Sequence, residues 1–368
     1  MLSHHLRRRL RWPAAVMGSL ALALVLSACA DADDETDADP ATEEQDDPVD
    51  DEDDSAGDDG EESGDDGQPY QIAYLSASSA NTWLQASLVE MNAIAAENNA
   101  EITEFDAQFE PGAQAGQVQD VITSGQYDAI IISSVDGAGI IPDLEEALDA
   151  GLEVGILNQV VGDALDTAEP QFDGPAVSAL APPLRSGERF GEMTLQACEG
   201  ISPCNVVYFY GIRGVPIDIA LREGFDDVTA ANPDITVVAE AEGQYLGPDV
   251  ALAEMQDVLS RTQDIDVVVG PDQSIQGVQL ALEDAGIEGV ALIGLGGSEP
   301  AFEGIRAGTW FGTVYGAPAT EGQIVIEGIL AALRDGTMTG GVDPLSDKPD
   351  GGLVTADNVD EFEAQWAG

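Results

Sequence analysis

From residue 70 onward, short apolar runs alternate with longer segments in which apolar residues recur at helical spacing. The apolar runs predict strands at 71–75, 101–105, 128–133, 153–157, 205–210, 235–240, 265–270, 290–295 and 311–315. The helical pattern is clearest at 82–98, 248–261 and 274–285. Several runs are apolar at every position, which is typical of parallel strands buried on both faces. We therefore predict an α/β fold built from repeated β–α–β units.

This many strands exceeds what one open sheet usually holds, so the pattern favours two lobes. The run Leu180-Ala181-Pro182-Pro183-Leu184 falls between the two series of strands. Its two prolines cannot continue a helix, and a crossover between lobes suits it.

The N-terminus has the composition of an export signal. Arginines gather in residues 7–11, and residues 12–28 are uncharged and mostly apolar. That apolar stretch is short for a membrane-spanning helix, and small residues follow it. It ends Leu26-Ser27-Ala28-Cys29, which resembles the bacterial lipobox Leu-[Ala/Ser]-[Gly/Ala]-Cys. The resemblance implies a signal peptide at 1–28 and a lipid anchor on Cys29 at the outer face of the cytoplasmic membrane. An uncleaved membrane anchor is the alternative.

Residues 29–69 form a candidate tether. More than half of the positions in 31–67 are acidic and none is basic. Such a segment cannot bury enough apolar surface to offset its ordering entropy, so we predict a disordered spacer. The alternative, a calcium-binding tail, lacks an Asp-x-Asp-x-Asp-Gly loop.

The whole chain is strongly acidic, with 70 Asp and Glu, 12 Lys and Arg, and a formal net charge of -58. This balance excludes a nucleic-acid partner bound through a basic face, and it argues against docking on anionic lipid. We interpret the acidity as adaptation to a salt-rich habitat, because salt screens like charges on a surface.

The types of reactive side chain present narrow the candidate functions further. The two histidines, His4 and His5, lie within the predicted signal peptide, so the exported protein has no imidazole base or ligand. We expect no metal site, cofactor or enzymatic activity, and we interpret Gly294-x-Gly296-Gly297 as a turn rather than a phosphate loop. Cys198 and Cys204 flank a Ser-Pro turn in an exported chain, which predicts a local disulfide rather than a metal site.

Several blocks resemble type I periplasmic binding proteins of the ribose/galactose-binding group of ABC transporters. The chain opens with Ile72-Ala73-Tyr74-Leu75 and then Asn81-Thr82-Trp83-Leu84. In the same order follow 128–132 (DAIII), 151–154 (GLEV), 222–225 (REGF), 255–259 (MQDVL) and 292–294 (LIG). The resemblance implies two Rossmann-like lobes with parallel sheets, joined by a three-segment hinge, with the ligand between them. The crossovers fall near 181–184, 316–318 and 341–344, giving an N-terminal lobe of 70–181 plus 317–342 and a C-terminal lobe of 182–316 plus 343–368.

The resemblance also places candidate ligand contacts. Relatives carry an Asn and aromatics where this chain has Asn81 and Trp83, and an Asp-Arg pair where it has Asn158 and Gln159. Further candidates are Arg213, in place of an arginine that relatives carry elsewhere, Asp272, and the walls Tyr245 and Tyr315.

Three polar ligand residues of the relatives are replaced in the second lobe, by Pro271, Gly296 and Gly316. We therefore expect a roomier cleft with fewer hydrogen bonds to the solute.

These features together predict a monomeric, lipid-anchored solute-binding protein of an ABC importer. It would capture a sugar or sugar-like molecule by hinge closure and deliver it to a membrane permease. Three alternatives stay open. The chain is a receptor subunit that presents its ligand to a membrane sensor, or it binds a less hydroxylated or aromatic solute, or it is an exported enzyme that uses a pair of cleft carboxylates.

Overall fold

The structure, a computed structural model, describes residues 67–368. The predicted signal peptide, the lipid attachment site at Cys29 and nearly all of the acidic segment lie outside the described residues. They stay predictions.

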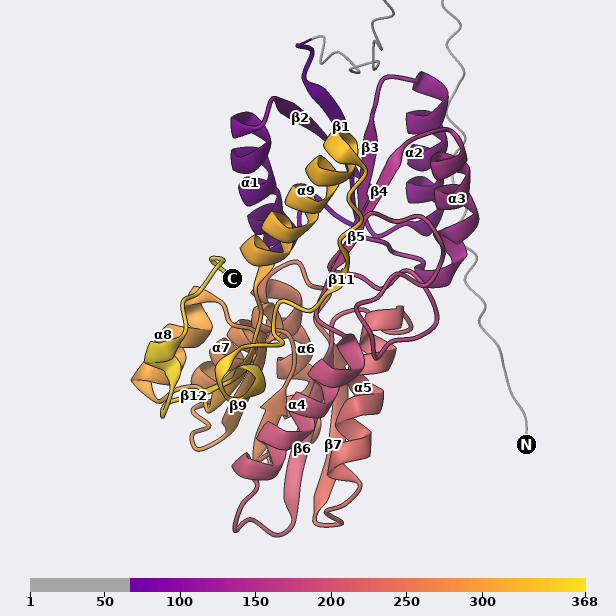
Figure 1. Ribbon diagram of the computed structural model, residues 1–368. Coiled ribbons are helices and arrows are strands. Elements are labelled where there is room, and N and C mark those ends of the chain that lie inside the picture. The colour runs from indigo at the N-terminus through magenta and orange to yellow at the C-terminus, as the bar shows by residue number, and fades with distance from the viewer. Residues whose placement is uncertain (1–66) are drawn as a thin grey trace, which may run out of the picture. The chain divides into compact units, whose positions relative to one another are not determined.

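Two sheets of six strands organise the described part of the chain (Figure 1). In spatial order the first sheet consists of β11 (Gly340–Val342), β5 (Val177–Ala179), β4 (Glu153–Leu157), β3 (Ala129–Ile132), β1 (Tyr70–Ser76) and β2 (Ala100–Asp106). The second consists of β12 (Leu353–Thr355), β10 (Gly312–Tyr315), β9 (Ala291–Gly296), β8 (Val267–Val269), β6 (Cys204–Tyr210) and β7 (Ile235–Glu242). Neighbouring strands run parallel, apart from β12, which runs antiparallel to β10. The predicted α/β class with two lobes is confirmed.

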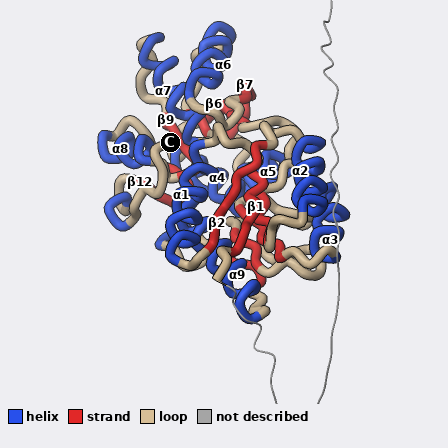
Figure 2. The backbone as a smooth tube through the Cα atoms, turned by 90° about the horizontal axis from the view of Figure 1, so that it is seen from above, coloured by secondary structure: helices blue, strands red, loops and turns tan. Residues whose placement is uncertain are grey.

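Helices cover both faces of each sheet (Figure 2). On the first sheet these are α1 (Thr82–Glu97), α2 (Pro111–Ser124), α3 (Ile141–Asp149) and α9 (Pro318–Asp335). On the second they are α4 (Pro183–Ala197), α5 (Pro216–Thr229), α6 (Pro248–Arg261), α7 (Asp272–Ala285) and α8 (Glu299–Ala307). Short 3₁₀ turns are η1 (Gly137–Ile140), η2 (Pro349–Gly352) and η3 (Val359–Glu361). We call the first sheet with its helices the N-terminal lobe and the second the C-terminal lobe.

The alternation of side chains along β1 explains why two layers of helices are needed. Ile72 and Tyr74 pack in the cluster under α1 and α9, whereas Ala73 and Leu75 pack in the cluster under α2 and α3. All four side chains are fully buried. A strand that is apolar on both faces removes its surface from water only when helices cover both sides.

The close pair α4 and α5 depends on glycine. A Cβ at Gly187 would lie 2.3 Å from the carbonyl oxygen of Leu221, and one at Gly224 would lie 2.2 Å from that of Leu184. The two helix backbones can therefore meet only where neither carries a side chain.

All the strands predicted from apolar runs are present, with ends shifted by a few residues. The sequence missed β5, β11 and β12, which have three residues each. Three residues are too few to show a period, and these strands form because the edges of the larger sheets offer them partners.

The chain passes between the sheets at three places. It leaves the first sheet after β5 and enters α4, returns after β10 into α9, and leaves again between β11 and β12. Pro183 and Pro318 are the first residues of the two helices that follow crossovers, where the missing N–H of proline costs nothing.

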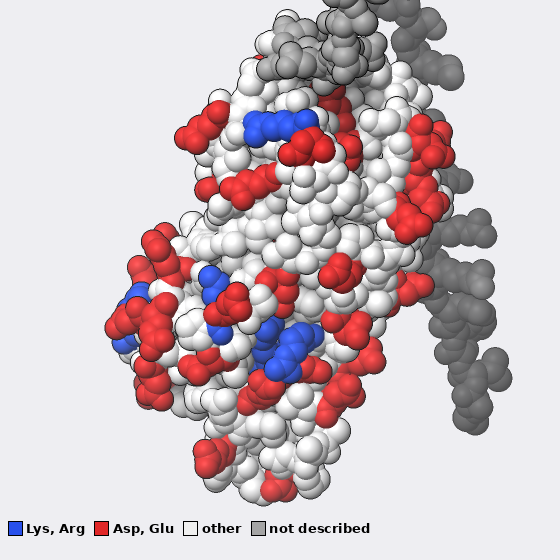
Figure 3. Space-filling model, in the orientation of Figure 1, with Lys and Arg blue, Asp and Glu red and all other residues white. Residues whose placement is uncertain are grey.

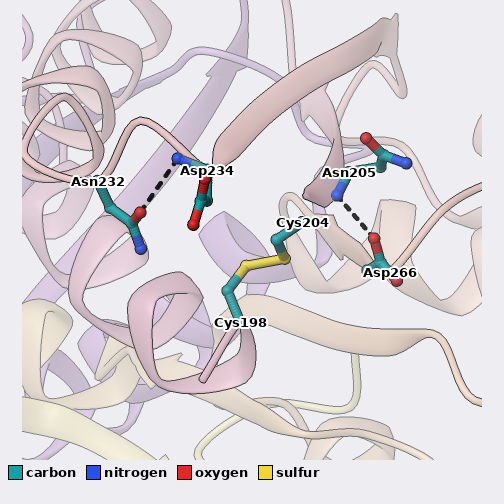
Figure 4. The surroundings of a disulfide bond; sticks show 6 residues. All are labelled: Cys198, Cys204, Asn205, Asn232, Asp234 and Asp266. Atoms are coloured by element: carbon teal, nitrogen blue, oxygen red, sulfur yellow. Dashed lines mark hydrogen bonds between the residues drawn. A yellow bond between two sulfur atoms is a disulfide. The ribbon is translucent and has the colours of Figure 1, made fainter. Parts of the chain in front are cut away.

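A disulfide joins Cys198 and Cys204, the two cysteines for which the sequence predicts one, with an S–S distance of 2.03 Å (Figure 4). It connects the end of α4 to the start of β6. Beside it, the N–H of Asn205 donates to Asp266 and the N–H of Asp234 donates to Asn232. The bond therefore ties the carboxyl end of α4 to the amino end of β6, an inner strand of the second sheet.

Acidic side chains are spread over both lobes on the face drawn in Figure 3, and the few basic side chains there lie among them. Several arginines pair with neighbouring acids, as in Arg213 with Glu240 at 2.9 Å and Arg306 with Asp360 at 3.1 Å. Within residues 67–368, no helix combines the length and apolar character that spanning a membrane requires.

Candidate functional site

A cavity of about 90 Å³ lies between the lobes, where the carboxyl ends of their strands face each other. The N-terminal lobe contributes Ala77, Asn81, Trp83, Leu84, Ser133, Asn158 and Gln159. The C-terminal lobe contributes Ile217, Tyr245, Pro271, Gln273 and Leu295. Ligand sites of open α/β sheets form at this edge, because the loops after parallel strands converge there. We call this space the main cavity.

A smaller cavity of about 50 Å³ adjoins it and shares Trp83, Asn158, Ile217 and Leu295 with it. Tyr315 and Glu321 line only this smaller one of the two. Five of the predicted site residues thus meet at the main cavity (Asn81, Trp83, Asn158, Gln159 and Tyr245), and Tyr315 lies beside the smaller one.

Arg213 and Asp272 are not brought to either cavity. Arg213 is exposed, pairs with Glu240 and lies 4.1 Å above the ring of Tyr210. Asp272 is fully buried and accepts the N–H of Ser298 at 2.7 Å and the hydroxyl of Thr313 at 2.9 Å. Burial raises the pKa of Asp272 to about 6. Its carboxyl holds the β9–α8 turn in place, so the geometry supports a solute contact for neither residue.

The expected extra room at Gly296 and Gly316 is not there, because two tryptophans fill it. A Cβ at Gly316 would lie 2.1 Å from the ring of Trp83, and a Cβ at Gly296 would lie 2.5 Å from the ring of Trp366. The expectation of a roomier cleft is therefore wrong at these two positions. The glycines admit aromatic rings, not a larger solute.

Trp366 comes from the C-terminal segment, which the sequence analysis did not connect with the cleft. Its indole N–H donates to the carbonyl of Gly296 at 2.7 Å. Its ring meets Trp83 edge to face, with ring centroids 5.4 Å apart. The contact joins the two lobes and limits the positions that Trp83 can take.

Two buried polar side chains at the main cavity have no protein partner. The hydroxyl of Ser133 is fully buried and makes no hydrogen bond among the described residues. Gln273 is 3% exposed, and no hydrogen bond of its side-chain amide occurs within residues 67–368. One lies in each lobe. The hydroxyl of Ser133 has no accessible surface, so a solute does not reach it, whereas the amide of Gln273 is not sealed off and is the one suited to a bound molecule.

Ser133 directly follows the buried strand β3, and Gln273 follows β8 by a few residues, which are the places where strand ends converge. Their positions after strands could have indicated both residues in the sequence. The sequence predicted Asp272 instead of the adjacent Gln273, but Asp272 points into the protein interior and Gln273 lines the cavity.

Asn81 links the lobes through its side chain. Its Oδ1 accepts the N–H of Leu84 at 3.0 Å and caps α1, while its Nδ2 donates to the carbonyl of Tyr245 at 3.1 Å. The same amide therefore starts a helix of one lobe and bonds to a loop of the other.

Backbone conformation is unusual at the cavity wall. Asn158 has φ 64° and Tyr245 has φ 55°, both in the left-handed region that disfavours residues with a Cβ. The hydroxyl of Tyr245 donates to Asp218 at 3.1 Å, and Asp218 also accepts the N–H of Gly211 at 2.7 Å. Burial raises the pKa of Asp218 to about 6. Backbone strain of this kind concentrates at functional sites.

Glu321 is the principal residue that the sequence analysis missed. It is 1% exposed, and its Oε2 accepts the indole N–H of Trp83 at 3.2 Å and Nδ2 of Asn158 at 3.1 Å. The N–H of Ala181, in the first crossover, also donates to it. Burial raises the pKa of Glu321 to about 8. In the sequence it looks like an ordinary acidic residue of a helix's first turn.

The chemistry available at the main cavity is neutral. Its described lining contains amides, a hydroxyl, a tyrosine and apolar side chains, and no Lys, Arg, Asp or Glu. No group of three or more potential metal ligands occurs within residues 67–368. This lining is suited to a small uncharged molecule with hydroxyl groups and an apolar face.

Comparison with known proteins gives matches along most of the chain. The model of the periplasmic binding protein domain matches residues 72–337. A xylitol-binding protein of Mycolicibacterium smegmatis is 28% identical over 275 residues, which is 73% of each chain. The galactofuranose-binding protein YtfQ of Escherichia coli is 24% identical over 177 residues, 48% of this chain and 53% of that one.

Solved structures agree in fold. An ABC transporter solute-binding protein from Mycobacterium smegmatis, with bound glycerol, superposes with a TM-score of 0.69 at 23% identity. The match covers 82% of this chain and 99% of the other.

The raised pKa of Glu321 predicts a specific dependence of stability on pH. Because the folded pKa lies above the usual value of 4.5, the folded state holds a proton that the unfolded state releases. Wild-type stability therefore falls as the pH rises toward and through about 8. Glu321→Gln removes this loss. Urea unfolding should show the variant gaining about 2 kcal/mol on wild type between roughly pH 6 and pH 9.

Glu327→Gln is the matched control, since Glu327 is exposed on the same helix. The control should follow the wild-type pH curve. A Glu321→Gln curve parallel to that of wild type would contradict the prediction.

Proposed function

The chain belongs to the periplasmic binding protein domain family, and we propose that it captures a small, neutral, hydroxyl-rich solute between its lobes outside the cytoplasm. The resemblance stated from the sequence is confirmed by this membership, as is the prediction of a binding protein rather than an enzyme. The solute class is a polyol or a sugar.

The observation that carries the proposal is the neutral, polar lining of the main cavity. The amides of Gln159 and Gln273 can hydrogen-bond to a hydroxyl solute, and Trp83 offers an apolar face to its carbon skeleton. The named relatives support this class, since they bind xylitol and galactofuranose by name, and one solved neighbour contains glycerol.

Capture proceeds by closure of the lobes about the three crossovers. The moving units are those predicted from the sequence, 70–181 plus 317–342 and 182–316 plus 343–368. The hydrogen bond from Asn81 to Tyr245 and the contact of Trp83 with Trp366 support closure, because each joins one lobe to the other across the cleft.

Delivery of the solute to a membrane permease is inferred from the family membership and from the sequence of the N-terminus. The protein acts as a monomer that hands its solute to an ABC permease, held at the outer face of the membrane through a lipidated Cys29. The support for anchoring is the sequence Leu26-Ser27-Ala28-Cys29 behind an arginine-rich, apolar segment. Residues 29–69 act as a spacer.

The solute class is tested by a thermal-shift titration of the purified protein in high salt. Xylitol, glycerol, myo-inositol and galactofuranose are compared with citrate and lysine as charged controls. A solute at about a hundred times its Kd stabilises the folded state by about 2.7 kcal/mol, a visible shift. We expect shifts with neutral polyols or sugars alone. A shift only with a charged solute, or none with any neutral solute, would contradict the proposal.

The role of Asn81 in closure is tested with Asn81→Asp. Aspartate keeps the acceptor that caps α1 but replaces the donor to the Tyr245 carbonyl with an oxygen. The melting temperature without solute should change little, while solute affinity falls by about tenfold because the closed form is disfavoured. Asn98→Asp, at the other end of α1, serves as the control. Unchanged solute affinity in Asn81→Asp would contradict a role of Asn81 in closure.

Lipid anchoring is tested by fractionating a bacterial host that processes lipoproteins. Cys29→Ser should move the protein from the membrane fraction to the medium or periplasm. Ser27→Ala, which keeps the lipobox pattern, should leave it on the membrane. If the Cys29→Ser protein stays membrane-bound, the apolar segment 12–28 itself is the anchor.

A further inference from the structure

The buried carboxyl of Glu321 has a place in the cleft that solute capture alone does not explain. It lies at the start of α9, directly after the second crossover, and lines the smaller cavity behind Trp83 and Asn158. It does not line the main cavity. Its effect on a solute therefore passes through the side chains that it holds.

Hydrogen bonds lead from Glu321 to the main cavity in one direction. Oε2 of Glu321 accepts Nδ2 of Asn158 at 3.1 Å, and Oδ1 of Asn158 accepts Nε2 of Gln159 at 2.8 Å. We call these three residues the Glu321–Asn158–Gln159 relay. Each amide uses its nitrogen toward Glu321, so the carbonyl oxygen of Gln159 is the acceptor left at the far end of the relay, beside the second N–H of the same amide.

The direction follows from the two donors that share Oε2 of Glu321. The indole N–H of Trp83 can only donate, so Oε2 serves as an acceptor for it. An ionised carboxylate also only accepts from Asn158, and a neutral carboxyl does the same when its proton lies on Oε1. Asn158 then turns its oxygen toward Gln159.

We propose that Glu321 is a positioning residue that sets the hydrogen-bond polarity of the main cavity through Asn158, so that Gln159 presents an acceptor to the solute. This inference rests on the proposed function. The solute must place a hydroxyl donor opposite Oε1 of Gln159. Solutes with an ether or carbonyl oxygen at that point are rejected, because two acceptors would face each other in a buried site.

The test is isothermal titration calorimetry with xylitol and its mono-O-methyl ethers, on wild type, Glu321→Met and the exposed control Glu327→Met. Methionine keeps the length of Glu321 but offers no acceptor, so the amide of Asn158 is free to flip. Wild type and Glu327→Met should bind xylitol equally and reject at least one ether. Glu321→Met should bind xylitol about tenfold more weakly and lose most of that rejection.

A double-mutant cycle separates positioning from general damage. Gln159→Met removes the acceptor while leaving Glu321 and Asn158 intact, and it should cause the same loss of discrimination. The Glu321→Met/Gln159→Met double variant should then lose no more discrimination between xylitol and its ethers than Gln159→Met alone, because both act at one point.

Losses of discrimination that simply add would overturn the relay, as would a folded Glu321→Met protein with wild-type affinity and discrimination. Should Glu321→Met fail to fold, unchanged discrimination in Gln159→Met overturns it independently. Wild type that binds xylitol while discriminating against none of the ethers overturns the relay alone. Wild type that binds neither xylitol nor any other neutral polyol or sugar overturns the proposed function, and the relay with it.

Discussion

The cleft of this protein is governed by the cost of burying polar groups without partners. Gln273 is 3% exposed, and its side-chain amide has no hydrogen-bond partner within residues 67–368. A buried amide without a partner costs on the order of 1–3 kcal/mol. Under the proposed function, a hydroxyl-bearing molecule in the main cavity would supply that partner and favour the closed arrangement. Capture and closure would then be linked without any chemical step.

Contacts around the main cavity hold its lining side chains in place. Gly316 leaves space for Trp83, and Trp366 from the end of the chain packs against the same ring. Glu321 then holds Trp83 and Asn158 from behind. Each partner has few alternatives, so the donors and acceptors at the wall are fixed before a solute arrives. Preorganisation of this kind reduces the entropy lost on binding. The acidic side chains seen in Figure 3 are not matched in this lining, which contains no Asp or Glu among the described residues.

Much of the architecture could be predicted because buried parallel strands are apolar at every position, as β3 and β8 are. The edge strands β5, β11 and β12 could not, because three residues carry no period. Residues just after strands, such as Asn158, line the main cavity because strand ends converge at one edge; their contact with a solute stays a prediction. Asp272 shows the limit of that reasoning. Its position is adjacent to the cavity, but the N–H of Ser298 draws its carboxyl inward. Glu321 and Trp366 were missed because their roles depend on contacts between segments far apart in the sequence.

The most direct test is a crystal structure of the protein grown with xylitol. The account predicts density for the solute in the main cavity, with hydroxyl groups within hydrogen-bond distance of the amide of Gln273 and of Oε1 of Gln159. Asn81 should still bond to the carbonyl of Tyr245, and Glu321 should make no direct contact with the solute. A solute bound elsewhere, or a main cavity that holds water alone at saturating xylitol, would contradict the account.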